Sequence, residues 1–146
     1  PAPPPVRLSG RVRRALPALW LLLATPASAG LFGPDAPGRI PIPARPFDGR
    51  LEDRTGVVID VTRLTFDGEV YLFGTVGLAQ VTVPFERLAL VEVGPGADAD
   101  HVVARATTRE GAVQELVLES DRPFYGLAAF GNYKLEAGDL RRLTVR

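Results

Sequence analysis

Three residues in one short loop have side chains that could bind a metal ion. Asp98, Asp100 and His101 lie within four positions of one another in the run GPGADADH. Carboxylates beside an imidazole suit a divalent cation, but these side chains supply at most three ligands, without the glycine that frames a calcium-binding loop. We therefore expect a solvated acidic loop that opens a strand, with no bound metal and no cofactor. The three residues stay the candidates if a metal is found.

Side chains for covalent or acid–base catalysis are scarce. The sequence has no Cys, His101 is its one His, and Ser120 is the one Ser beyond residue 29. Ser120 stands between Glu and Asp, without the glycines that expose a nucleophile at a sharp turn. Gly74 and Gly77 lie in a strand pattern rather than before a helix, so they do not form a phosphate-binding loop. We expect no catalytic residues, and an envelope hydrolase is the third and least favoured interpretation.

Aromatic side chains gather near glycines in two stretches of the chain. Tyr71 and Phe73 lie in the first stretch, and Tyr125 and Tyr133 lie in the second. Glycines inside strands let a neighbouring backbone or ring approach closely, often at a bend or bulge. One interpretation is a core whose glycines make room for rings. The other is a groove in which one or two of these four rings stack on a sugar or hold an apolar peptide side chain.

The elements that must position these residues are almost all strands. Val57, Ile59 and Val61 occupy alternate positions, the period of a half-buried strand. Similar alternation recurs to the C-terminus and is interrupted by turn signals, the strongest of which is Asp67-Gly68. The sequence predicts an all-β domain over residues 51–146, built as a small antiparallel sandwich or barrel.

The β region also matches itself at an offset of 52 residues. Phe73–Val93 aligns with Tyr125–Val145 without a gap, and Leu88 then aligns with Leu140. The match predicts two similar β units, each covering the apolar face of the other. We expect these units at about 56–93 and 101–146, with both leucines buried.

Turn residues extend the match upstream at a different offset. Asp67-Gly68 aligns with Glu110-Gly111 at an offset of 43 residues. This alignment predicts that the second unit has extra residues between its hairpin turn and its aromatic-glycine pair.

The N-terminal part predicts an export signal and a tether. Residues 1–29 hold four Arg, an apolar run of ten residues, and Ala27 and Ala29 in the A-x-A pattern of a signal-peptidase site. The run is too short for the ~30 Å hydrocarbon core of a membrane. We expect cleavage after Ala29 without stable membrane insertion, then a Pro- and Gly-rich extended segment over residues 30–50. The protein would be periplasmic or extracellular.

Charge limits the classes of partner. The chain has 17 basic and 17 acidic residues, but the four Arg of the leader leave 13 basic and 17 acidic residues beyond it. An acidic surface argues against nucleic acid and anionic membranes as partners. We expect an exported, non-enzymatic β module that has a structural role or binds another envelope protein or component. The alternative is a small carbohydrate- or ligand-binding domain. The sequence does not define the oligomeric state.

Overall fold

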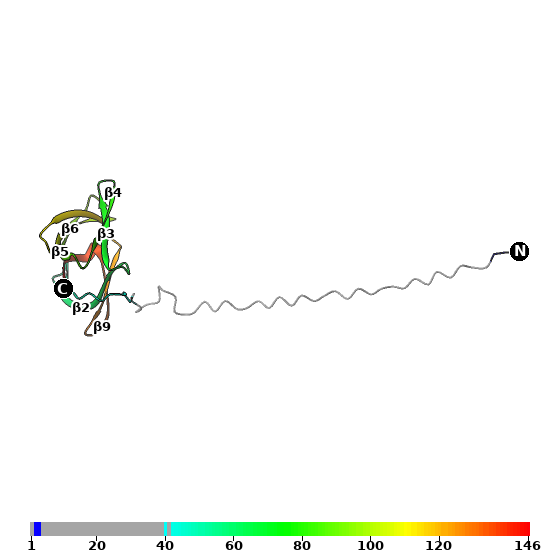
Figure 1. Cartoon of the computed structure of the whole chain (residues 1–146), viewed down its shortest axis with the longest axis horizontal. Helices are drawn as coiled ribbons and strands as arrows, with labels where there is room; N and C mark the ends of the chain where they lie inside the picture. Colours follow the sequence, from blue (N-terminus) through cyan, green and yellow to red (C-terminus); the bar gives the residue numbers. More distant parts are fainter. Residues whose placement is uncertain (1, 4–39, 41) are drawn as a thin grey trace. The chain divides into compact units, whose positions relative to one another are not determined.

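The computed structural model describes residues 2–3, 40 and 42–146 (Figure 1). The chain divides into two units, Pro1–Leu31 and Phe32–Arg146, and every strand belongs to the second. The expected cleavage site and most of the expected tether lie outside the described residues. Within the described part of the chain, no helix is long and apolar enough to cross a membrane.

Ten strands and one short 3-10 helix make up the domain. They are β1 (Gly49–Asp53), β2 (Val58–Phe66), β3 (Tyr71–Val76), β4 (Ala79–Pro84), β5 (Leu88–Pro95), β6 (His101–Thr108), β7 (Val113–Glu119), β8 (Pro123–Ala128), β9 (Gly131–Glu136), η1 (Ala137–Asp139) and β10 (Leu140–Val145). The all-β prediction is confirmed for the described residues.

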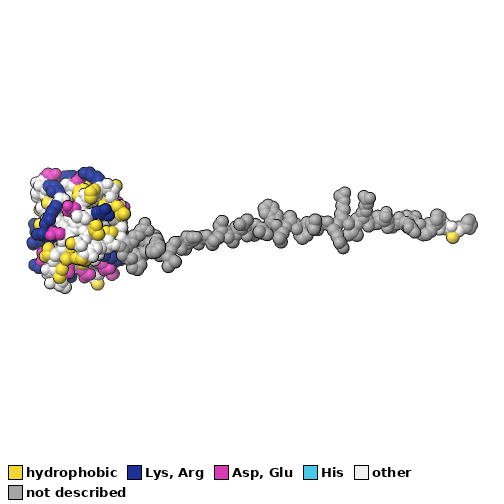
Figure 2. Space-filling view, turned by 90° about the horizontal axis from the view of Figure 1, so that it is seen from below, with side chains coloured by type: hydrophobic (Ala, Val, Ile, Leu, Met, Phe, Trp, Pro, Cys, Tyr) yellow, Lys and Arg dark blue, Asp and Glu magenta, His cyan; other side chains and the backbone are white. Residues whose placement is uncertain are grey.

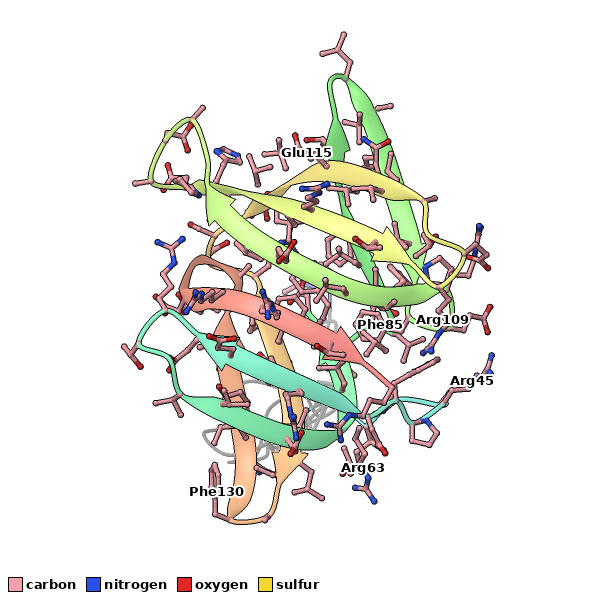
Figure 3. The ribbon with its side chains drawn as sticks, turned by 90° about the vertical axis from the view of Figure 1, so that its left-hand side faces the viewer. Arg45, Arg63, Phe85, Arg109, Glu115 and Phe130 are labelled. Carbon is pink, nitrogen blue, oxygen red and sulfur yellow. The ribbon has the colours of Figure 1, made fainter. Side chains whose placement is uncertain are left out.

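All ten strands form one antiparallel sheet that curls into a half-barrel (Figure 3). Their order across the sheet is β4-β3-β7-β6-β5-β10-β1-β2-β8-β9. The sheet is therefore continuous rather than two separate layers, and β4 and β9 lie at its two edges.

The strand order has an internal symmetry. Two strands that lie equally far from the two edges of the sheet are counterparts. The counterparts are β4 and β9, β3 and β8, β7 and β2, β6 and β1, and β5 and β10. The bounds of β3 and β4 shifted by 52 residues are those of β8 and β9, and the cross-strand register within the two hairpins is also the same. At the centre, Val91 of β5 lies opposite Leu143 of β10, and these two residues are themselves 52 positions apart. The halves β1–β5 and β6–β10 are thus related by an approximate two-fold axis at this pair.

The turn at Asp67-Gly68 forms as predicted, but the strands beside it separate. Both residues have positive φ angles, 50° and 86°, as in a type I′ turn, and Phe66 and Glu69 exchange backbone hydrogen bonds of 2.8 and 2.9 Å. Beyond this bridge β2 pairs with β8, and β3 pairs with β7. Each half therefore places its hairpin beside a strand of the other half.

The alignment of Asp67-Gly68 with Glu110-Gly111 is wrong. Glu110-Gly111 joins β6 to β7, whereas Asp67-Gly68 joins β2 to β3. The structural counterpart of Asp67-Gly68 is the turn between β7 and β8, at Ser120 and Asp121. Turn residues recur at many hairpins, so they align in sequence without occupying equivalent places.

The core lies inside the curl of the sheet. Leu88 and Leu140, which begin β5 and β10, are both fully buried, as predicted. Phe66, Phe85 and Phe124 are the largest fully buried side chains, and the rings of Phe66 and Phe124 lie 4.7 Å apart. Apolar residues from every part of the domain therefore share one core.

The outer surface carries both signs of charge. On the face shown in Figure 2, basic and acidic side chains are interspersed. Arg50 of β1 bonds Asp60 of β2 through two hydrogen bonds of 2.8 and 3.0 Å, and Arg141 of β10 bonds Glu52 of β1 at 3.0 Å. Exposed pairs of this kind contribute little to stability because solvent screens them, so they set strand neighbours less than the core does.

Candidate functional site

A groove of about 480 Å³ lies where the β3–β4 hairpin meets β7. Figure 3 shows the green hairpin extending beyond the yellow strand β7, which crosses it. Side chains from both hairpin strands, from β7, from the start of β6 and from two turns line the groove. They are Asp67, Glu69, Tyr71, Phe73, Gly74, Thr75, Gln80, Val81, Thr82, His101, Val117, Glu119 and Arg122.

The groove opens because β3 and β7 stay together only briefly. Their pairing consists of one residue pair, Thr75 opposite Val117. Next to it, a Cβ atom on Gly74 would lie 2.5 Å from the Val117 carbonyl oxygen, so β7 passes closer than any side chain would allow. The missing side chain lets the two strands cross, and the crossing forms one wall of the groove.

Two aromatic rings form the apolar part of the groove. Tyr71 and Phe73 lie at alternate positions of β3, and their ring centroids are 5.9 Å apart in an edge-on arrangement. The Phe73 ring also contacts the buried Phe66 ring, with centroids 4.9 Å apart. Phe73 therefore packs against the core, and both rings are half-buried.

A guanidinium group links the aromatic wall to acidic residues. Arg122 bonds the carboxylates of Glu119 and Asp67, and its Cζ atom lies 5.5 Å from the centre of the Phe73 ring. The hydrogen bond to Glu119, followed by that to Asp67, raises the pKa of Arg122. With Glu69, the lining has three carboxylates against the Arg122 guanidinium and the His101 imidazole, so it stays acidic even with the imidazole protonated and favours a ligand that carries positive charge.

The acidic loop places His101 at the end of the groove. Its Nδ1 atom lies 2.7 Å from Oδ1 of Asp98, and the backbone N–H of Asp100 donates to the same oxygen at 3.0 Å. The hydrogen bond and the charge of Asp98 raise the pKa of His101, and the same hydrogen bond lowers the pKa of Asp98. Among the described residues, no group of three His, Asp or Glu is placed to hold a metal ion. The Asp98 carboxylate instead closes the loop.

The His101–Asp98 contact predicts a pH dependence. We expect His101 to titrate above its ordinary pKa of 6.5 in the full chain, followed by NMR of its ring protons. Because folding favours the protonated ring, the contact stabilises the fold below pH 6.5 and is lost as the pH rises through the raised value. Asp98→Asn should return the pKa toward the ordinary value. Titration of His101 at or below 6.5 in the unmodified chain would show that the contact does not form in solution.

Ser120 lies near this loop but not beside the imidazole. Its hydroxyl donates to the Ala99 carbonyl oxygen at 3.0 Å, and its Cβ lies 3.2 Å from where a Cβ of Gly138 would stand. Ser120 lies just past the end of β7, and its hydroxyl bonds Ala99 while the His101 ring bonds Asp98. The structure therefore does not bring Ser120 and His101 together as a nucleophile and its base.

Of the four aromatic candidates, the groove contains Tyr71 and Phe73. Tyr125 lies on β8, opposite Thr65 and Lys134, and Tyr133 of β9 packs against the core. Burial, and then the charge of Asp53, raise the pKa of Tyr133. These two tyrosines lie on the β8–β9 hairpin, which is the counterpart of the β3–β4 hairpin in the other half of the domain.

A second groove lies beside that other hairpin and differs in character. It has a volume of about 360 Å³, and no aromatic side chain lines it. Its lining consists of Asp48, Gly49, Asp60, Val61, Thr62, Leu127, Ala128, Ala129 and Arg146. The grooves beside the two equivalent hairpins are thus lined by different side chains, so the two halves of the domain have diverged in their surface chemistry.

The sequence did not indicate Glu119 and Arg122. Both lie around the turn between β7 and β8, more than 40 positions from Tyr71. They reach the groove because β7 pairs with β3, a long-range contact without a local signature. The sequence also did not indicate Phe66, the ring that supports Phe73 from across the Asp67-Gly68 turn.

Comparison with known proteins gives a family. A family model described as an uncharacterised protein matches residues 43–146, a range that includes all ten strands, and the chain belongs to that family. Searches of curated proteins and of solved structures gave no match.

Proposed function

We propose that this protein is an exported, non-enzymatic β module that binds another protein or component of the cell envelope through the groove of β3, β4 and β7. The observation that carries the proposal is the combination of aromatic and charged side chains in one groove. Tyr71 and Phe73 supply apolar surface, and the carboxylates beside Arg122 supply polar groups held in place. Binding sites typically combine a mostly apolar wall with a few fixed polar groups.

Export and the lack of catalysis have separate support. The Arg-rich leader and the A-x-A pattern at Ala27 and Ala29 support secretion. The Ser120 hydroxyl donates to the Ala99 carbonyl oxygen rather than to His101, which supports a binding role over a serine hydrolase. A hydrolase would need a nucleophile and a base in mutual contact.

A small carbohydrate is the second candidate ligand. The half-buried Tyr71 ring stands beside Phe73 on one wall, and sugars commonly stack on such rings. The carboxylates of Glu69 and Asp67 could accept hydrogen bonds from hydroxyl groups. A sugar would depend on Tyr71 and tolerate high salt, whereas a charged protein partner would be sensitive to salt.

Complementation in the host tests the proposed function. In a strain that lacks the native gene, we expect the double variant Tyr71→Ala, Glu69→Gln to fold and to lose the function that the unmodified chain restores. The matched variant Ser120→Ala should fold and keep that function, because its hydroxyl contacts one loop carbonyl. Thermal unfolding of purified protein checks both folds. Loss of function in folded Ser120→Ala, with the double variant active, would instead support the hydrolase.

A further inference from the structure

The two edges of the sheet differ in how they are protected. Edge strands expose unpaired backbone groups, and proteins usually guard them with charged residues or proline. β9 carries Lys134 and Glu136, whereas β4, with the sequence AQVTVP, carries no charged residue. Its one guard is Pro84, at its last position. Most of β4 is therefore left open to pairing.

The register of the β3–β4 hairpin shows which backbone groups are free to pair. The two-residue turn closes at the hydrogen-bonded pair of Val76 and Ala79. Non-hydrogen-bonded and hydrogen-bonded pairs then alternate along the two strands. This alternation directs the N–H and C=O groups of Gln80 and Thr82 away from β3. The side chains of the same two residues line the groove. A strand added to β4 would thus place alternate side chains on the groove face.

The charge of the groove selects what such a strand must carry. Asp67, Glu69 and Glu119 contribute three carboxylates, and Arg122 is held by two of them. A second copy of this chain would bring two acidic grooves together at a β4–β4 pairing, which like charges disfavour. A partner with a lysine or arginine side chain suits the same surface.

We propose that an extended peptide segment of a partner protein binds as an added strand on β4, with a basic side chain at the carboxylates of the groove. An apolar side chain of the same segment lies against Tyr71 and Phe73. Backbone pairing provides the docking, and the groove provides the selectivity, as in other cases of strand addition. This inference rests on the proposed function and specifies the partner's chemistry and the manner of its binding.

Hydrogen exchange on the unmodified full chain tests strand addition. The probe is an eight-residue peptide with Thr at every second position and with Val and Lys alternating at the positions between, so that Val and Lys share one face of the added strand. At saturating peptide we expect exchange of the Gln80 and Thr82 amides to slow at least about tenfold, because they gain partners. The amides of Val81 and Val83 already bond β3 and should change little. Unchanged exchange at Gln80 and Thr82 would overturn the inference.

The symmetry of the domain supplies a matched pair of variants. Thr82→Pro removes an outward N–H on β4, and Lys134→Pro removes the corresponding N–H on β9. Proline is tolerated at such outward positions of edge strands. We expect Thr82→Pro to weaken peptide binding at least about tenfold and Lys134→Pro to leave it unchanged, since backbone pairing carries the docking. Equal binding by both variants would contradict pairing on β4. If Thr82→Pro does not fold, the exchange pattern above decides the question.

Charge selectivity is tested separately. Glu69→Gln should weaken binding of the Lys peptide about two- to fivefold, the size of an exposed ion pair. The same peptide with Glu in place of Lys should bind more weakly to the unmodified chain. Equal binding of the two peptides would overturn the assignment of a basic partner. Perturbation of Tyr71 and Phe73 without protection of Gln80 and Thr82 would reject strand addition and leave the groove as a binding site, so the two proposals fail separately.

Discussion

Replacing Leu88 with Ala should lower the free energy of unfolding by about 2–5 kcal/mol, and replacing Leu140 should have an effect in the same range. Both side chains are fully buried, and each begins a central strand after a tight turn. Truncation removes apolar surface from the core and leaves a cavity, because neighbouring side chains relax only partly. The approximate two-fold symmetry places both residues in equivalent surroundings, so their costs should be similar.

Equilibrium unfolding in urea measures these costs. Leu78→Ala is the control, because Leu78 lies fully exposed in the turn between β3 and β4. Its replacement should change the free energy of unfolding by less than about 0.5 kcal/mol, as is usual at surface positions. A cost below about 1 kcal/mol at either buried leucine would fall outside the range for core truncation. The two strand starts would then not serve as equivalent packing positions.

Much of the local structure was predictable because its causes are local. The alternation of apolar residues sets strand positions, and Asp67-Gly68 adopts the positive φ angles that its turn requires. The 52-residue offset also identified equivalent hairpins, since β8–β9 repeats the bounds and register of β3–β4. The strand positions, the turn and the register within each hairpin all depend on residues that lie within a few positions of one another.

Strand neighbours could not be predicted in the same way. A tight turn usually joins two paired strands, yet β2 and β3 part after the bridge between Phe66 and Glu69. Each then contacts a strand of the other half, β2 contacting β8 and β3 contacting β7. The Phe66 ring, which packs on Phe124 of β8, is one such contact. Pairing of this kind depends on the whole core, so no short stretch of sequence indicates it.

In the candidate site, too, some residues follow from local sequence and others from the long-range pairing of strands. The cluster of aromatic residues near Gly74 includes Tyr71 and Phe73, and both line the groove. Tyr125 and Tyr133 share that sequence pattern but lie in the other half. The charged part of the site comes from Glu119 and Arg122, whose position depends on which strand β3 meets. The sequence pattern singled out the aromatic residues of the groove. Which charged residues lie beside them follows from the order of the strands in the sheet.

The second prediction concerns the two glycines at which strands cross. Gly74→Ala and Gly126→Ala should each destabilise the fold by about 1–3 kcal/mol, because the added methyl group has no space. A Cβ on Gly74 would lie 2.5 Å from the Val117 carbonyl oxygen, and one on Gly126 would lie 2.6 Å from the Val61 side chain. Gly94→Ala is the control, since nothing lies within 4 Å of its Cβ position. That variant should unfold at the same urea concentration as the unmodified chain or slightly above it.

The two glycines face different obstacles, a backbone carbonyl at Gly74 and a side chain at Gly126. At Gly126 the obstacle is the Val61 side chain, whose Cβ and Cγ2 atoms would both lie 2.6 Å from the added methyl group. Val61→Ala removes the Cγ2 contact and leaves the Cβ contact, so it should relieve part of the clash and cost less in the Gly126→Ala background than in the unmodified chain. At Gly74 the nearest obstacle is backbone, and trimming a neighbouring side chain cannot remove it. Strand β7 must therefore move away from β3, which would alter the groove as well as the stability. Gly74→Ala should then weaken binding of the Lys peptide while Gly126→Ala leaves it intact. Equal effects of the two variants on binding would show that the crossing at Gly74 does not shape the groove.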